Sequence, residues 1–339
     1  MIDWFRGAIP FRHVPISGGL VMSISPEGVI DWQVHKGLQV RGSYESSLMI
    51  KSRGSCGDGS ASHLWIDGNI SKFLQGHNLF GSRDLVDLVY KTFTRITNDF
   101  KALTFDPLDG VSAEQSILAG DFDVKALDIN QLYQLDNDRS VESWLYACEM
   151  QAHRRAGRST ATRGTVYIGK NSRRWAVKFY NKYREMLKNQ EDSHPSYQRL
   201  LSFSQGLLRA ELRLLSLELK DLGLTKGHHF TESVINELFA SYMGRIEMTK
   251  NATLVDDQLM SLPRAAQATY QMWRTGISCR EMLPKNTFYR HRRLLLDSGI
   301  DINFPPISPE RNNVVPLLRI VEAVPIANPG WAYDLQLIA

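Results

Sequence analysis

Two short segments near the middle of the chain constrain its fold most, because together they read as a β-hairpin. Apolar and polar residues alternate through residues 164–169 and again through 175–183, and the connection KNSRR is a typical turn. Alternation of this kind indicates strands with one buried face, and strands joined by so short a connection are antiparallel. We therefore expect an antiparallel sheet at the centre of the fold.

The segments around this hairpin show either strand-like alternation or helical periodicity. Short strand-like runs occupy residues 19–24, 28–34, 47–50, 63–66 and 122–135. Apolar residues recur at helical spacing in 82–100, which opens on the candidate N-cap Ser82, and in 139–157. This order is typical of an α+β domain. We predict an antiparallel-sheet domain over residues 1–225, followed by a helix-rich C-terminal domain over residues 226–339.

Basic residues are concentrated in a few places. The formal net charge is only +4, from 40 Lys plus Arg against 36 Asp plus Glu, whereas residues 154–184 and 285–293 are rich in bases and poor in acids. Local basic patches on a nearly balanced protein predict binding of a polyanion at defined places.

Cysteine usage and hydropathy bound the class of protein. Cys56, Cys148 and Cys279 lie far apart and predict neither a zinc site nor a disulfide framework. The sequence has no signal peptide and no run of about 20 apolar residues that could cross a bilayer. We therefore expect an intracellular protein that does not enter a membrane.

The segment RRWAVKFYNKYRE, residues 173–185, places phenols beside cations. As a helix it would put Tyr180 and Tyr183 on one face, and as a strand it would put Tyr180 and Lys182 on one face. A phenol has an ordinary pKa of about 10, and a nearby cation favours the nucleophilic phenolate. The pattern therefore fits a tyrosine that attacks a phosphodiester. It fits equally a half-buried strand whose basic residues face water.

Acidic residues in two strand-like segments are candidate metal ligands. Asp128 lies within 122–135, and Glu211 alternates with Arg209 and Arg213 in LLRAELRL, residues 207–214. Burying an acid is costly unless it is paired or binds a cation. Metal binding, an exposed edge-strand Asp and a surface salt-bridge ladder all remain open, as does a helical reading of 207–214.

The C-terminal region contains a candidate helix-turn-helix. One predicted helix ends near Gly276, a short one runs through Glu281, and a third opens at Lys285. The third carries the aromatic and basic side chains Tyr289, Arg290, Arg292 and Arg293. This helix predicts duplex DNA binding, although the same layout occurs in helical domains that bind nothing.

Four blocks of sequence resemble a known family. These are KFLQGHNLFG at 72–81, WAVKFYNKYRE at 175–185, LLRAELRL at 207–214 and NNVVPLLR at 312–319. They are similar, in the same order, to blocks of the replication initiators of filamentous bacteriophages, the gene II protein family. The beginning MIDW and the end WAYDLQLIA resemble the family's termini, so the resemblance covers essentially the whole chain.

The resemblance implies a rolling-circle initiator endonuclease acting in the host cytoplasm. Such an enzyme nicks the viral strand of the double-stranded replicative form at the origin, through a tyrosine linked to the 5′-phosphate. It leaves a 3′-hydroxyl for a host polymerase, and later cuts again and rejoins the displaced single strand as a circle. Matching of the blocks assigns the nucleophile to Tyr180 and a catalytic role to Lys182. It also implies a host helicase and polymerase as partners.

The same chemistry suggests roles for the remaining residues. A divalent cation, most simply Mg²⁺, would be held by Asp128 and Glu211, with His77 as a third ligand. Related nucleases use a histidine pair, and this chain departs from it, because HLW at 63–65 has only the first histidine. Contacts to DNA are expected from Gln75, Asn78, Lys178, Arg209, Arg213, Lys285, Tyr289, Arg290, Arg292 and Arg293. A phosphotyrosine retains the energy of the broken bond, so rejoining requires no ATP.

Two other classes remain open on sequence grounds. A non-catalytic DNA-binding replication regulator would use the C-terminal helices without forming a covalent adduct. A tyrosine recombinase or topoisomerase would form a 3′-phosphotyrosine without a metal. An internal start at Met248 could also give a shorter product.

Overall fold

The computed structural model describes most of the chain. The described residues are 1–16, 18–44, 46–99, 113–152, 160–162, 164–189, 194–245, 262–297, 300, 302–303 and 326–339. Met248 and the block at 312–319 lie outside them. No helix among these residues is long and apolar enough to cross a membrane.

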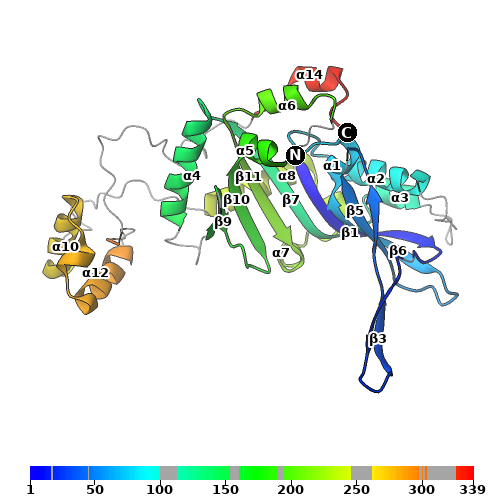
Figure 1. The fold of residues 1–339 in the computed structure, drawn as a ribbon, viewed down its shortest axis with the longest axis horizontal. Helices are drawn as coiled ribbons and strands as arrows, with labels where there is room; N and C mark the ends of the chain where they lie inside the picture. The colour runs from blue at the N-terminus through cyan, green and yellow to red at the C-terminus, as the bar shows by residue number, and fades with distance from the viewer. Residues whose placement is uncertain are drawn as a thin grey trace.

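The centre of the molecule is a nine-stranded antiparallel sheet, as the hairpin pattern predicted (Figure 1). Its spatial order is β4-β5-β6-β1-β7-β11-β10-β9-β8. In that order the strands span Leu38–Arg41, Ser47–Arg53, Ala61–Asn69, Ile2–His13, Asp123–Gln134, Leu207–Leu215, Trp175–Asn181, Thr165–Ile168 and Thr160–Thr162. The α+β prediction is confirmed, and so is the strand reading of 207–214.

One face of the sheet is covered by helices. Phe93 of α2 (Leu85–Asp99) packs edge-on against Phe11 of β1 with ring centroids 5.1 Å apart. Trp144 of α4 (Asp138–Ala152) and Tyr242 of α8 (Glu232–Arg245) pack likewise on β10. Buried side chains between these layers form the main hydrophobic core.

The opposite face is covered only at one end. Leu132 of β7 lies opposite Arg209 of β11 and therefore on the same face. It joins a second, smaller core with α5 (Lys182–Asn189), α6 (Tyr197–Phe203) and α14 (Gly330–Asp334). The polar residues of β10, β11 and β7 lie beside this cover, where the sheet passes from buried to exposed.

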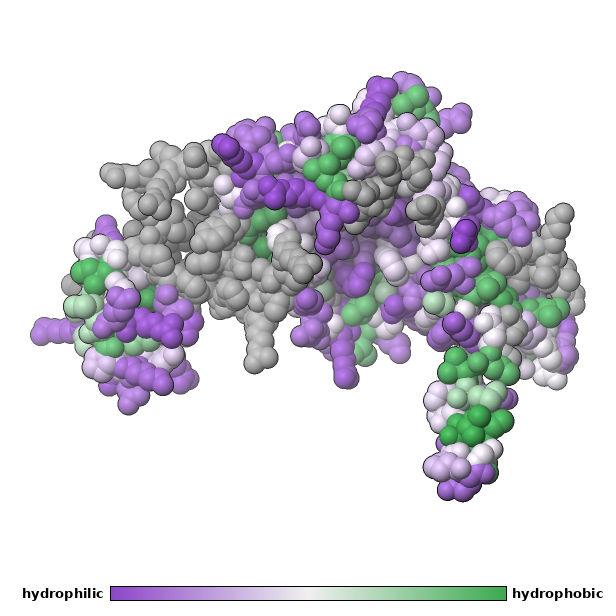
Figure 2. Space-filling model, viewed as in Figure 1, coloured by the Kyte–Doolittle hydropathy of each residue, from purple (hydrophilic) through white to green (hydrophobic). Residues whose placement is uncertain are grey.

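A two-stranded hairpin projects away from the sheet. It consists of β2 (Leu20–Ile24) and β3 (Ile30–His35), and it links β1 to β4 (Figure 1). Its apolar side chains are exposed, with Val29 at 63% and Trp32 at 53%, and Figure 2 shows them as a green arm.

The C-terminal helices form a core of their own. The elements α10 (Arg264–Arg274), α11 (Cys279–Met282) and α12 (Lys285–Asp297) pack around Tyr270, Phe288 and Leu295. Their succession follows the predicted helix-turn-helix layout. The remaining helices are α1 (Ile70–Gln75), α3 (Ala113–Leu118), α7 (Ser216–Asp221) and the short 3₁₀ turn Gly227–His229.

The structure corrects several local predictions. Helix α2 begins at Leu85, and the side chain of Asp84, not that of Ser82, accepts the Asp87 amide at 3.0 Å. Strand β10 ends at Asn181, so Lys182 opens a helix and does not share a strand face with Tyr180. The main core includes residues of α8, so the sheet unit continues past residue 225.

Candidate active site

The register of β10, β11 and β7 gathers the predicted residues on one face of the sheet. Lys178 pairs with Glu211 and Tyr180 with Arg209 across β10 and β11. On the other side of β11, Arg213 pairs with Asp128. Because side chains at alternate strand positions share a face, all of these groups point the same way.

Tyr180 is nearly buried, with 7% of its surface exposed. Its hydroxyl donates a hydrogen bond of 3.3 Å to Oε2 of Glu211. Burial raises the pKa of the Tyr180 phenol well above its usual value of 10, although the Arg209 guanidinium acts in the opposite direction. The phenol is therefore protonated in the protein alone.

Glu211 is buried beside this phenol and is ionised. Its Oε1 accepts an ion pair of 2.7 Å from Nζ of Lys178. Burial alone would raise the pKa of Glu211, but the cations Lys178 and Arg209 outweigh it and lower the pKa below 4.5. A carboxylate that accepts the proton of a hydroxyl is the arrangement that activates a nucleophile.

Asp128 and Arg213 form a two-pronged ion pair. Nε of Arg213 lies 2.9 and 3.0 Å from the two oxygens of Asp128, and Nη2 lies 2.6 Å from one of them. Burial raises the pKa of the Asp128 carboxyl to about 7 despite Arg213. The Arg213 side chain is itself 46% exposed, so this pair joins the buried site to the open surface.

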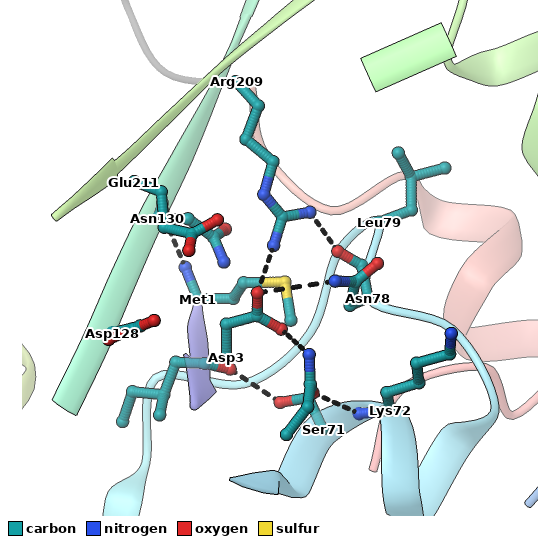
Figure 3. A network of polar contacts seen from close by, with 12 residues as sticks. Met1, Asp3, Ser71, Lys72, Asn78, Leu79, Asp128, Asn130, Arg209 and Glu211 are labelled. Atoms are coloured by element: carbon teal, nitrogen blue, oxygen red, sulfur yellow. Dashed lines mark hydrogen bonds and ion pairs between the residues drawn. The ribbon is translucent and has the colours of Figure 1, made fainter. Parts of the chain in front are cut away.

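Asp3 of β1 belongs to the same cluster, and sequence reasoning missed it. Its Oδ2 accepts an ion pair of 3.0 Å from Nη2 of Arg209, whose side chain is fully buried. Arg209 also donates to the backbone carbonyl of Asn78, and Asn69 donates to Asp3. Figure 3 shows Asp3 between Arg209 and Asn78. An acid within the alternating residues of 2–13 was the available signal.

Lys182 is placed close to this cluster by the start of α5. Its ammonium is buried and donates to Oδ1 of Asn78 at 2.8 Å and to Glu185 at 2.5 Å. Burial lowers the pKa of Lys182, although Glu185 acts to raise it. Lys182 therefore ties the loop that contains Asn78 to the segment that follows Tyr180.

His77 and Gln75 are engaged by the protein backbone. Nε2 of His77 lies 2.9 Å from the carbonyl oxygen of Leu337, and its Nδ1 accepts the amide of Leu79 at 3.3 Å. Burial lowers the pKa of His77 to about 3. Gln75 donates to the carbonyl oxygen of Phe80 at 2.6 Å. The structure thus gives both residues a part in holding the loop and the C-terminal segment together.

Two buried donors near the phenol have no partner in the described part of the chain. They are Nε of Arg209 and Nδ2 of Asn130, and Asn130 pairs with Glu211 in the register. A buried polar hydrogen without an acceptor is costly, and an anionic oxygen would satisfy both. These donors mark a place for a phosphate.

The described residues contain no group of three or more His, Cys, Asp or Glu side chains arranged to hold a metal. Mg²⁺ is usually held by one or two carboxylates together with substrate phosphates and water. Asp128 and Glu211 supply the oxygen donors that such a site requires, so the residues fit a magnesium ion that is completed by substrate.

On α12, the predicted DNA-contacting residues form an exposed face. Lys285, Tyr289 and Arg293 recur every fourth residue and are exposed, as is Arg290, whereas Arg292 is half-buried. This geometry fits a helix that could contact a polyanion.

Comparison with known proteins gives matches over nearly the whole chain. Residues 1–233 match the family model of the N-terminal part of the replication-associated protein of phage gene 2, and residues 254–338 match the model of its C-terminal part. The chain is 38% identical to the replication-associated protein of this name from Enterobacteria phage I2-2, with 98% of this chain and 96% of that protein covered. It is 24% identical to the proteins of the same name from Enterobacteria phages M13 and f1, with 77% of this chain and 75% of each relative covered.

Proposed function

The chain belongs to the family of the gene 2 replication-associated proteins, and we propose that it initiates rolling-circle replication of a filamentous phage genome by nicking DNA. The hydrogen bond between Tyr180 and Glu211, set among cations and unpartnered donors, carries this proposal. The substrates are the origin of the double-stranded replicative form and later the displaced viral single strand. The reaction would take place in the host cytoplasm, with a host helicase and polymerase as partners.

In the proposed reaction, the Tyr180 oxygen attacks the phosphorus of the scissile phosphodiester while Glu211 accepts the phenolic proton. The bond from phosphorus to the 3′-oxygen breaks as the bond from phosphorus to the tyrosine oxygen forms. The 3′-oxygen leaves, takes a proton from water and becomes the primer end. Rejoining reverses these steps with another 3′-hydroxyl as the attacker, so no ATP is consumed.

The cations of the site bind the phosphate and stabilise its developing charge. Lys178 and Arg213 are partly exposed and hold Glu211 and Asp128 in the protein alone. An incoming phosphate offers these cations an alternative anionic partner. Nε of Arg209 and Nδ2 of Asn130 are fixed donors for its oxygens, and such preorganised donors lower the barrier of phosphoryl transfer. Lys182 positions the segment around Tyr180.

A divalent cation completes the proposed site. Asp128 and Glu211 are the residues that would hold Mg²⁺, and the bound ion would offset negative charge on the phosphate and on the leaving oxygen. His77 is not part of this proposal, because both of its ring nitrogens contact protein groups.

Helix α12 would bind the duplex at the origin. Its exposed Lys285, Tyr289, Arg290 and Arg293 offer several phosphate contacts on one face. Duplex binding by this helix and cutting by the sheet domain divide the work between the two parts of the chain.

The proposal is tested by trapping the covalent adduct. The protein is incubated with supercoiled replicative-form DNA and Mg²⁺ and stopped with SDS, and the DNA-linked peptide is sequenced by mass spectrometry. We expect a 5′-phosphate on Tyr180 that disappears with EDTA. An adduct on Tyr183 would move the site, and a 3′-linked adduct would indicate a recombinase or topoisomerase. DNA binding with neither nick nor adduct would indicate a non-catalytic regulator.

A further inference from the structure

A strip of cations and tryptophans crosses the exposed part of the sheet, starting at the candidate active site. It contains Arg213 of β11, Trp4 and Arg6 of β1, Trp65 of β6, and Lys51 and Arg53 of β5; we call it the cation–tryptophan strip. No role in the proposed cutting reaction accounts for its outer half.

The inner half of the strip is a connected set of contacts. The guanidinium carbon of Arg213 lies 5.8 Å from the ring centroid of Trp4. The indole of Trp4 donates to Asp67 of β6 at 2.8 Å, and Nε of Arg6 donates to the other oxygen of Asp67 at 2.7 Å. These contacts place β11, β1 and β6 side chains on the same face and hold Trp4 and Arg6 in fixed positions.

The outer half carries cations without anions. The guanidinium carbon of Arg53 lies 3.7 Å from the ring centroid of Trp65, and Nζ of Lys51 lies 6.0 Å from the same centroid. Neither cation forms an ion pair with any acid in the described part of the chain. Arg53 is exposed and Lys51 half-buried. Two cations oriented by one aromatic ring and left without an anion form a prepared anion site.

We infer that the cation–tryptophan strip binds the single DNA strand that flanks the scissile phosphate. This inference rests on the proposed function and specifies how that site holds its substrate. Grooves for unpaired strands combine cations that follow the backbone with aromatic or guanidinium planes on which bases stack. The strip offers both, because the Arg53 guanidinium is held flat against an aromatic ring.

The dimensions suit a short single strand. Strands β11 and β5 are four positions apart in the sheet, which corresponds to about 19 Å at the usual spacing between strands. This length accommodates roughly five to six nucleotides at about 3.4 Å per phosphate. A separated strand is also the form in which a phosphate can reach a phenol that is only 7% exposed.

The test measures binding of oligodeoxythymidines of increasing length by fluorescence anisotropy at several salt concentrations. The full chain carries Tyr180→Phe throughout, so binding is measured without cleavage. The strip variant adds Lys51→Gln and Arg53→Gln. A matched control adds Arg139→Gln and Lys220→Gln, which remove two positive charges from exposed positions of α4 and α7. A charge-preserving variant adds Lys51→Arg and Arg53→Lys.

We expect the strip variant to bind about 10- to 30-fold more weakly at 0.1 M salt. The slope of log K against log salt should be smaller in magnitude by about 1.4, because each lost phosphate contact contributes about 0.7. The control should keep the original slope, and the charge-preserving variant should recover it.

Two results would overturn the inference. In one, the strip variant and its control weaken binding equally or keep the same slope. In the other, the strip variant loses affinity for duplex DNA but not for single strands. Adduct formation by the protein with Tyr180 intact tests the proposed function separately, so a failure of the strip is distinguishable from a failure of the nuclease assignment.

Discussion

The hydroxyl of Tyr180 and the carboxylate of Glu211 lie 3.3 Å apart on neighbouring strands, with the phenol protonated and the carboxylate ionised. Each is held there by strand register and not by a flexible loop. Burial raises the pKa of the phenol, and Lys178 lowers that of the carboxylate. The pair is therefore poised but inactive until a bound phosphate draws Lys178 away from Glu211.

Replacing Glu211 by Gln tests this pairing. Gln retains the size of the side chain and can still accept the phenolic hydrogen, but it cannot take up the proton or supply a charged ligand. We expect adduct formation in a single turnover to fall by about 10²- to 10⁴-fold, the usual contribution of a general base. Binding of single-stranded DNA should persist. An adduct rate within threefold of the original protein would remove Glu211 from the reaction.

Tyr180→Phe should abolish both nicking and adduct formation. The fold should be nearly unaffected, because the substitution removes one long hydrogen bond and preserves the buried ring. Circular dichroism and thermal unfolding check the fold, and relaxation of supercoiled DNA checks nicking. Tyr183→Phe is the matched control, since Tyr183 lies three residues later in α5, and it should nick normally. Residual 5′-linked adduct on the Tyr180→Phe protein would contradict the assignment.

Asp3→Ala should destabilise the protein strongly. It leaves the guanidinium of Arg209 buried without its acidic partner, and breaking a buried pair in this way usually costs about 3–5 kcal/mol. Arg6→Gln is the control, because Arg6 pairs with Asp67 near the surface, where its side chain is 42% exposed. That change should cost less than about 1 kcal/mol. Denaturant unfolding measures both, and equal effects would argue against a structural role for the Asp3–Arg209 pair.

Asp128 should give stability a pH dependence of defined sign. Its pKa is raised to about 7 from an ordinary value of 3.8, so between these values the folded protein binds a proton that the unfolded chain releases. The free energy of unfolding should therefore fall as pH rises from about 4 to 7, and Asp128→Asn should remove this contribution. Titration of His77 is common to both proteins and cancels in the difference. Parallel stability curves from pH 4.5 to 8 would contradict the raised pKa.

Charge reversal on α12 tests the division of work between the domains. Arg290→Glu with Arg293→Glu should weaken binding to duplex origin DNA and reduce its salt dependence by about 0.9 for each lost phosphate contact. Adduct formation on a single-stranded oligonucleotide should continue, because the sheet residues are unchanged. Gel-shift and adduct assays separate the two effects, and unaltered duplex affinity would exclude this helix from origin binding.

The sequence predicted the elements whose signal is local. The hairpin of β9 and β10, the alternation around Glu211 and the three C-terminal helices have periodicities that their own residues determine. For that reason, the α+β fold and the helical C-terminal region followed from the sequence. The end of β10 did not, because alternation continues past Asn181 and only the structure shows that Lys182 opens a helix.

The candidate site was predicted in its residue types but not in its pairings. The pattern singled out Tyr180, Asp128 and Glu211, yet it did not show that Arg213 holds Asp128 or that Lys178 holds Glu211. These pairs depend on which strands are neighbours, and long-range strand order leaves no trace in a local pattern. Asp3 was missed for the same reason, since nothing near residue 3 indicates that β1 lies between β6 and β7.

The position of β1 also determines when the protein can become dangerous to DNA. Asp3 and Arg209 are 206 residues apart in the chain, and the ribosome adds about 5–20 residues each second. For roughly the first 10 to 40 s of synthesis, the nascent chain therefore has a tyrosine or an acid but no assembled site. A chain that stops early, or that starts at Met248, lacks part or all of this set of residues. Strand cutting is thereby restricted to molecules whose sheet has been completed.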